Sequence, residues 1–195
     1  MAPAEPRLRW VRRRLSPRAR VLDVGCHKGE MTRHLAAATT GGVVGLDISV
    51  GALTDARRAW RWGPERLAWV AGDAAALPFA DDAFDAVVLC EVLEHVPEPD
   101  AVLREAERVT RPGGAVLVSV PIDALGIDAF DRRQRAERLG YDLDMHVREV
   151  DPREMLAGRP DLVVSEEWVD VGPRTDGGPR RFGFRLAAYR VGEAA

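Results

Sequence analysis

Acidic side chains stand at or just after the ends of four consecutive apolar segments in the first half of this sequence. They are Asp23, Asp47, Asp73 and Glu91. A carboxylate accepts hydrogen bonds from hydroxyl, amino and ammonium groups through both of its oxygens. A single acid after a strand is often only a helix cap. Four in consecutive units predict a shared site for a small, nucleotide-like ligand.

A glycine-containing loop narrows the choice of ligand. Gly25 and Gly29 flank Cys26, His27 and Lys28, between an apolar run and a helical pattern, so that backbone N–H groups and a helix N-terminus face the ligand. A dinucleotide site needs a glycine at position 27, where the backbone approaches the pyrophosphate. Lys28 is the only lysine in the chain, which excludes the Tyr-x-x-x-Lys pair of many small dehydrogenases. The loop therefore favours a ligand without a pyrophosphate.

Strands and helices alternate along the chain, which predicts an α/β fold with a parallel sheet covered on both faces. Strands are expected at 21–24, 43–46, 67–71, 86–89 and 115–120, the last one stopped by Pro121, and two long closing strands at 162–171 and 182–191. Helices are expected at 29–38, 51–62, 100–110, 129–139 and 152–157, after an arginine-rich amphipathic helix within 7–20. Ligands of such sheets bind beyond the carboxyl ends of the strands, where the four acids fall.

Six motifs occur in order along the chain: Val21–Gly29, Gly45–Ser49, Gly72–Ala74, Leu77–Asp85, Glu91–Val96 and Arg111–Gly114. Over residues 20–120 the sequence thereby resembles the class I S-adenosylmethionine-dependent methyltransferases, in the broad group that includes the ubiquinone-biosynthesis methyltransferases. The resemblance implies a Rossmann-like, doubly wound sheet of seven strands in three αβα layers, mostly parallel with an antiparallel last strand. We expect one domain over 1–195, with a basic helical segment at 1–19, a cofactor-binding core at 20–120, an acceptor-side segment at 121–160 and closing strands at 161–195.

The resemblance implies which residues bind the methionine part of the cofactor. Asp23 would hold the methionine ammonium, often through water. The loop that the methionine approaches would be lined by Gly25, Cys26 and Gly29. The backbone at Cys90 and Glu91 would lie beside the same moiety.

The adenosine part would be bound at the ends of the next two strands. By the resemblance, Asp47 would accept both ribose hydroxyls and Ile48 would cover one face of the adenine. Asp73 would bind the adenine amino group, and the N–H of Ala74 would meet a ring nitrogen. One residue departs from the family pattern, because His27 stands where a glycine is usual.

Methyl transfer from a sulfonium is an in-line displacement, so the protein mainly aligns the acceptor with the methyl group. An oxygen or nitrogen acceptor also loses a proton, and histidine is the usual base near neutral pH. His146 and His95 are the candidates for this acid–base role, with Glu91 as a third catalytic candidate.

The same region allows a second interpretation. Glu91, Glu94, His95 and His146 form a set of oxygen and imidazole ligands that suits a divalent metal such as Mg²⁺, Mn²⁺ or Zn²⁺. Such a metal would hold vicinal oxygens of a catechol-like molecule, or of the terminal ribose of an RNA, and lower the pKa of the acceptor. In the metal-free alternative, Glu94 and His95 begin a helical segment and hydrogen-bond the loop that closes over the cofactor.

Composition limits the partners. The 195 residues carry a formal net charge of −3, so no global positive field attracts nucleic acid, although the arginines of 7–20 could contact phosphates. No apolar stretch is long enough to span a bilayer and no apolar signal core begins the chain, so we expect a cytoplasmic protein without a membrane partner. Cys26 and Cys90 are expected to be reduced thiols. The acceptor side is either open or completed by a second copy in a homodimer.

The sequence therefore predicts an enzyme that transfers a methyl group from S-adenosylmethionine to a small-molecule acceptor, at oxygen. Two alternatives stay open. One is a non-catalytic cofactor-binding or scaffold subunit with the same fold, and the other is a metal-assisted 2′-O-methyltransferase that acts on RNA.

Overall fold

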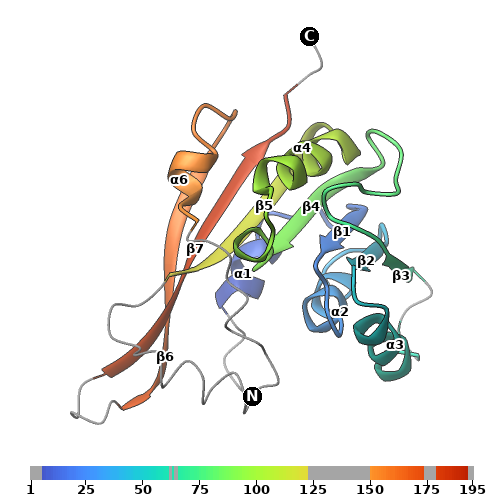
Figure 1. Ribbon diagram of the computed structural model, residues 1–195, viewed down its shortest axis with the longest axis horizontal. Coiled ribbons are helices and arrows are strands. Elements are labelled where there is room, and N and C mark those ends of the chain that lie inside the picture. The colour runs from blue at the N-terminus through green and yellow to red at the C-terminus, as the bar shows by residue number, and fades with distance from the viewer. Residues whose placement is uncertain (1–5, 62, 64–65, 123–149, 174–178, 193–195) are drawn as a thin grey trace.

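The computed structural model describes residues 6–61, 63, 66–122, 150–173 and 179–192. This part of the chain forms a seven-stranded sheet in the order β3-β2-β1-β4-β5-β7-β6 (Figure 1). The strands are β1 (Val21–Val24), β2 (Val43–Asp47), β3 (Leu67–Ala71), β4 (Phe84–Cys90), β5 (Thr110–Ile122), β6 (Val163–Pro173) and β7 (Pro179–Arg190). The first five run parallel to one another, and β7 runs antiparallel to both β5 and β6. The predicted α/β sheet with an antiparallel last strand is confirmed.

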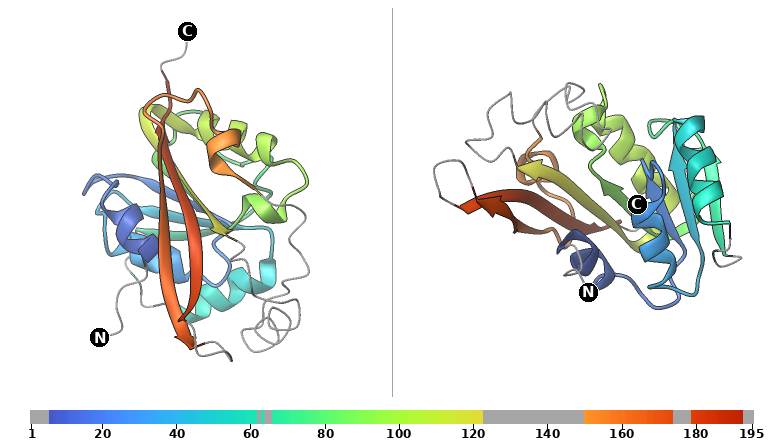
Figure 2. Two further views of the ribbon diagram at one scale, coloured as in Figure 1. Left: turned by 90° about the vertical axis from the view of Figure 1, so that its left-hand side faces the viewer. Right: turned by 90° about the horizontal axis from the view of Figure 1, so that it is seen from below.

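Helices cover both faces of this sheet (Figure 2). The helices are α1 (Pro6–Arg12), α2 (Glu30–Ala36), α3 (Val50–Ala59), α4 (Pro99–Val109) and α6 (Pro152–Met155), with a short 3₁₀ helix, η1 (Leu93–His95). One hydrophobic cluster joins α1 and α2 to Val21 and Val88, and a second joins α4 to Leu22 and Val87. Because neighbouring residues of a strand point to opposite faces, the continuous apolar runs of β1 and β4 supply both clusters. None of the helices in the described ranges is long and apolar enough to cross a membrane.

The strand order reverses beside β1. The chain passes from β1 outward to β2 and β3, and then returns to place β4 on the other side of β1. The carboxyl ends of β1 and β4 therefore border the point at which an open α/β sheet binds its ligand.

The prediction that Pro121 stops the fifth strand is wrong. β5 runs from Thr110 to Ile122, and Pro121 pairs with Phe184 of β7. The carbonyl of Ser119 accepts the N–H of Glu91, so residue 121 faces the same side of β5, beyond the end of β4 at Cys90. The N–H that proline lacks would point past the end of β4, where no strand accepts it. A sheet tolerates proline at such a position.

The predicted helices are confirmed in place but several are shorter. The helix expected at 51–62 is α3, which ends at Ala59, because Trp60 leaves the helical conformation at φ −109° and ψ 21°. The arginine-rich helix within 7–20 is α1, and it buries Leu8, Trp10 and Val11. The helix expected at 129–139 lies outside the described residues.

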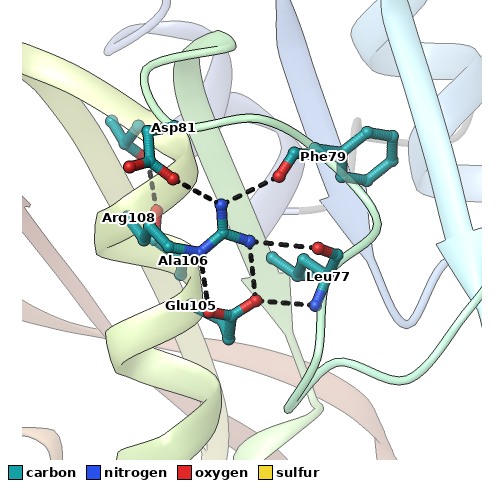
Figure 3. Close-up of polar contacts among 7 residues, drawn as sticks. Leu77, Phe79, Asp81, Glu105, Ala106 and Arg108 are labelled. Carbon is teal, nitrogen blue, oxygen red and sulfur yellow. Dashed lines mark hydrogen bonds and ion pairs between the residues drawn. The ribbon is translucent and has the colours of Figure 1, made fainter.

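The connection from β3 to β4 is fastened to α4 by one arginine (Figure 3). The guanidinium of Arg108 donates to the carbonyl oxygens of Leu77 and Phe79 at 3.0 and 2.8 Å and pairs with Asp81 at 2.7 Å. Glu105 accepts two bonds of 2.8 Å from the same guanidinium, and its Oε2 accepts the N–H of Leu77 at 2.7 Å. This network fixes the loop that also carries Asp73 and Ala74.

Replacing Arg108 with alanine should lower the free energy of unfolding by about 2 kcal/mol, because the Leu77 and Phe79 carbonyls and Glu105 lose a charged donor. Urea denaturation measures this loss. Arg104→Ala, at an exposed position of α4, is the matched control and should change stability by less than about 0.5 kcal/mol. Equal effects of the two substitutions would contradict the role given to Arg108.

Candidate functional site

A left-handed backbone shapes the loop between β1 and α2. Gly25, His27 and Gly29 have φ angles of 69°, 47° and 81°. A Cβ at Gly25 would lie 2.6 Å from Cγ2 of Val92, and one at Gly29 would overlap the ring of Trp69. Both glycines are therefore required, by conformation and by close approach.

The left-handed conformation at His27 explains why glycine is usual at this position. His27 nevertheless fits the loop, and its backbone N–H donates to Oδ2 of Asp47 at 2.7 Å. The departure from the family pattern thus leaves the path of the loop intact. It introduces a strained residue, at a cost of about 1–2 kcal/mol.

Two tryptophans hold the loop from the side of α3 and β3. Nε1 of Trp60 donates to the carbonyl oxygen of Lys28 at 3.0 Å, and the ring of Trp69 fills the space over Gly29 and Gly45. The local sequence contains only one signal of these contacts. It is the pair Gly29 and Gly45, two glycines on neighbouring segments that leave room for a large ring.

Asp23, in β1, lies beneath the loop. It is only 1% exposed, and its Oδ2 accepts the hydroxyl of Thr32 at 2.6 Å. Burial, together with the neighbouring charge of Asp47, raises the pKa of this carboxyl to about 7 against the opposing effect of the Thr32 bond. The carboxyl of Asp23 is therefore closed to direct contact with solvent.

Asp23 should make the stability of the protein depend on pH. The folded state holds a proton on this group between its ordinary pKa of 3.8 and about 7, whereas the unfolded state releases it, so stability falls as the pH rises through this range. Asp23→Asn should gain stability relative to the wild type across the same range, by up to about 1.4 kcal/mol per pH unit. Urea denaturation at pH 5, 6, 7 and 8 tests this, and parallel pH curves for the two proteins would contradict it.

Asp47 ends β2 and is anchored on two sides. Its Oδ2 accepts the N–H of His27 and its Oδ1 accepts the N–H of Ser49 at 2.8 Å. Each carboxylate oxygen keeps a further lone pair for a ligand. Ile48 follows with 76% of its surface exposed, so an apolar face stands beside a fixed carboxylate.

The end of β3 meets the end of β2. The N–H of Gly72 donates to the carbonyl oxygen of Asp47 at 3.1 Å, so the next residue, Asp73, follows close behind. Asp73 is exposed, its Oδ1 accepts the N–H of Ala75 at 2.8 Å, and Ala74 packs partly against the core. The structure thereby brings the residues expected for adenosine to one edge of the sheet.

Glu91 follows β4 with a left-handed φ of 56°. Its carboxylate pairs with Arg7 of α1, and the Arg7 guanidinium lies 4.2 Å from the centre of the Phe184 ring. Cys90 and Cys26 are free thiols, and burial raises the pKa of Cys90 to about 12 and that of Cys26 further still. Neither cysteine is thereby suited to act as a nucleophile.

The remaining candidates after β4 are not assembled as the sequence suggested. Glu94 is 2% exposed and neither carboxyl oxygen has a hydrogen-bond partner, so the prediction that it hydrogen-bonds the closing loop is wrong. His95 is exposed, and His146 lies outside the described residues. Among the residues that the structure describes, no group of three or more acidic, histidine or cysteine side chains is arranged to hold a metal. The expected ligand set is thus not formed by Glu91, Glu94 and His95 alone.

The family model for a methyltransferase domain matches residues 22–118. The strand order and the loops that carry the sequence motifs agree with this match. The chain belongs to the class I S-adenosylmethionine-dependent methyltransferases.

Two relatives indicate how far the similarity extends. A demethylmenaquinone methyltransferase of Renibacterium salmoninarum is 44% identical over 103 residues, which are 53% of this chain and 41% of the relative. Methyltransferase GfsG of Streptomyces halstedii is 41% identical over 102 residues, 51% of this chain and 37% of the relative. The chain thus matches less than half the length of either relative.

Solved structures share the fold over almost the whole chain. The YcgJ protein of Bacillus subtilis superposes with a TM-score of 0.72 at 18% identity, over 96% of this chain and 99% of that one. The [4+2]-cyclase SpnF superposes with a TM-score of 0.67 at 22% identity, over 95% and 80%. At this level of identity the likeness establishes the fold and not the reaction.

Proposed function

We propose that this chain is an enzyme that transfers the methyl group of S-adenosylmethionine to a small-molecule acceptor. The observation that carries the proposal is Asp47, a carboxylate held by His27 and Ser49 beside the exposed Ile48 at the sheet edge. When bound, the cofactor supplies a methyl group on a sulfonium that is already activated for displacement. The protein has to bind the cofactor and the acceptor, orient them toward each other and exclude water.

The adenosine part fits the ends of β2 and β3. Asp47 would accept the two ribose hydroxyls with the lone pairs that its backbone donors leave free. The adenine would lie against Ile48, and burial of that side chain would add an apolar contribution of about 1.5–3 kcal/mol. Asp73 and the N–H of Ala74 would bind the polar edge of the ring.

The methionine part fits the loop after β1. The methionine part would approach the backbone of Gly25, Cys26 and Gly29. Asp23 would act on the ammonium from beneath this loop, and Cys90 would contribute its backbone on the other side. A positive ligand charge would favour the ionised form of Asp23.

For the acceptor we propose an oxygen nucleophile of a phenol or catechol type. The names of the relatives support a small-molecule acceptor, since one is a demethylmenaquinone methyltransferase. His95 and His146 are retained as acid–base candidates on this side. A divalent metal held by Glu91, Glu94, His95 and His146 is retained as a hypothesis for which chelation is the test.

The direct experiment is turnover. The purified protein is incubated with S-adenosylmethionine and a panel of phenols, catechols, quinols, amines and a short RNA, and S-adenosylhomocysteine is quantified by mass spectrometry. Product formation with a phenol or catechol supports the proposal. Binding of the cofactor without product from any acceptor favours a scaffold subunit, and product only from RNA in the presence of a metal favours the 2′-O-methyltransferase.

We also propose that a second copy completes the acceptor side in a homodimer. We further propose that the protein is located in the cytoplasm. Light scattering after size exclusion gives the mass of the assembly, and a particle of 21.4 kDa would contradict the dimer. Fractionation of the source cells tests the location.

A further inference from the structure

The loop between β1 and α2 contains a strained residue at the place proposed for the methionine part of the cofactor. His27 has a φ of 47°, a left-handed conformation that glycine adopts freely and other residues adopt at a cost. Gly25 and Gly29, on either side of it, take the same conformation without that cost. The loop therefore needs contacts from outside itself to keep His27 in this conformation.

One such contact comes from Trp60, which follows α3. Its indole Nε1 donates to the carbonyl oxygen of Lys28, the residue after His27, at 3.0 Å. This carbonyl belongs to the peptide group that joins Lys28 to Gly29, so the bond fixes the part of the loop from which α2 begins. The side chain of Lys28 also pairs with Asp55 at 3.5 Å, but both side chains are more than half exposed, and such a pair contributes little.

Trp60 is itself held in place. Its backbone N–H donates to the carbonyl oxygen of Ala56 at 2.9 Å, and its carbonyl oxygen accepts the N–H of Gly63 at 2.7 Å. The guanidinium of Arg33 lies 4.7 Å from the centre of the Trp60 ring, a cation–π contact that joins α2 to α3 (Figure 1). The indole N–H is therefore presented to Lys28 from a fixed support.

Helix α3 connects the two parts of the proposed cofactor site. At its start, the N–H of Ser49 donates to Oδ1 of Asp47, and the side chain of Ser49 accepts the N–H of Ala52 at 3.2 Å. At its end, Trp60 holds the loop through Lys28. The carboxylate proposed for the ribose and the loop proposed for the methionine part are thus tied to opposite ends of one helix.

We propose that Trp60 is a positioning residue for the cofactor. It holds the strained His27 loop in the conformation that binds the methionine part, and it thereby gives the site its preference for a nucleoside that carries the amino-acid chain. This inference rests on the proposed methyltransferase function. A site whose binding conformation is only partly populated binds its ligand more weakly in proportion. Loss of the Trp60 bond therefore weakens binding of the whole cofactor more than binding of its adenosine part.

The test compares Trp60→Phe with the wild type. Phenylalanine keeps an aromatic ring for Arg33 but has no N–H for Lys28. Affinity for S-adenosylhomocysteine, measured by calorimetry, should fall about tenfold, near the upper end of the effect of one hydrogen bond. Affinity for 5′-methylthioadenosine, which lacks the amino-acid chain, should stay within twofold and is measured by competition against S-adenosylhomocysteine. Unchanged affinity for S-adenosylhomocysteine, or an equal loss for both ligands, would overturn the proposal.

The matched control is Trp10→Phe. It makes the same change at a tryptophan of α1 whose Nε1 has no hydrogen-bond partner among the residues that the structure describes. Because no bond to the loop is lost, both affinities should equal those of the wild type.

A second pair of variants tests whether Trp60 acts through the strain at His27. Glycine takes the left-handed conformation freely, so the loop of a His27→Gly protein keeps its path with less support. In that background, Trp60→Phe should weaken binding of S-adenosylhomocysteine by no more than about threefold, and a double-mutant cycle measures this coupling. The same loss in both backgrounds would contradict the role given to Trp60.

A third measurement needs no variant. Nitrogen-15 labelling of tryptophan allows the exchange of the Trp60 indole N–H with solvent to be followed in the wild-type protein. At saturation, S-adenosylhomocysteine should slow this exchange more than 5′-methylthioadenosine does. Equal exchange rates would overturn the proposal even if Trp60→Phe fails to fold. Failure of the wild type to bind S-adenosylhomocysteine at all would instead refute the methyltransferase function.

Discussion

Replacing Asp47 with alanine is expected to weaken the binding of S-adenosylhomocysteine by at least about 100-fold, which corresponds to about 2.7 kcal/mol. The substitution removes a charged acceptor for both ribose hydroxyls, and hydrogen bonds to charged groups contribute about 1.5–3 kcal/mol each. It also removes the acceptor that holds the N–H of His27 and of Ser49, so the loop and the start of α3 lose their common anchor. Isothermal titration calorimetry measures the affinity.

The control for this substitution is Asp55→Ala. Asp55 is an exposed residue of α3 whose carboxylate lies 3.5 Å from Nζ of Lys28, in the same loop. Asp55→Ala removes the same charge from a position close to the same loop, but a surface ion pair contributes at most about 1 kcal/mol. Affinity should therefore stay within about fivefold. An Asp47→Ala protein that binds as tightly as Asp55→Ala would contradict the ribose site.

Gly29→Ala is expected to destabilise the protein by about 3 kcal/mol and to abolish binding of S-adenosylhomocysteine. The residue begins α2 at φ 81°, where an L side chain is strained by about 1–2 kcal/mol. The new Cβ would also overlap the ring of Trp69, and such overpacking costs about 1–3 kcal/mol. Urea denaturation gives the stability and calorimetry gives the binding.

Two further variants separate these causes. Gly51→Ala, in α3, adds a Cβ whose nearest neighbour is Oγ of Ser49 at 3.9 Å, and it should stabilise the helix by up to about 1 kcal/mol. Trp69→Leu combined with Gly29→Ala should recover the part of the loss that is due to overlap, which a double-mutant cycle measures. If Gly29→Ala matches Gly51→Ala in stability and binding, the loop does not need its observed conformation.

The sheet could be predicted because each strand is marked by the residues of its own segment. Continuous valine and leucine runs such as Val21–Val24 are typical of strands buried on both faces, and the glycines and acids after them mark the edge where ligands bind. Pro121 shows where this reasoning fails. Whether a proline interrupts a strand depends on where the neighbouring strand ends, and that is set by the register of β4 against β5.

Part of the candidate site was predictable for the same reason. Asp47 is the last residue of β2 and Asp73 comes two residues after the end of β3, so their place at the edge is a consequence of sequence position. Glu91 and Glu94 could not be told apart, because Arg7 reaches Glu91 from 84 residues away and leaves Glu94 buried without a pair. The contacts of Trp60 and Trp69 with the loop were missed because they too depend on tertiary packing.

The most direct test of the account is a calorimetric titration of the wild-type protein with S-adenosylhomocysteine, with NAD as the comparison ligand. Asp47, Ile48 and Asp73, beside a loop with His27 where a dinucleotide site has glycine, predict one bound S-adenosylhomocysteine per chain and no binding of NAD. Heat from NAD, or none from S-adenosylhomocysteine, would contradict it.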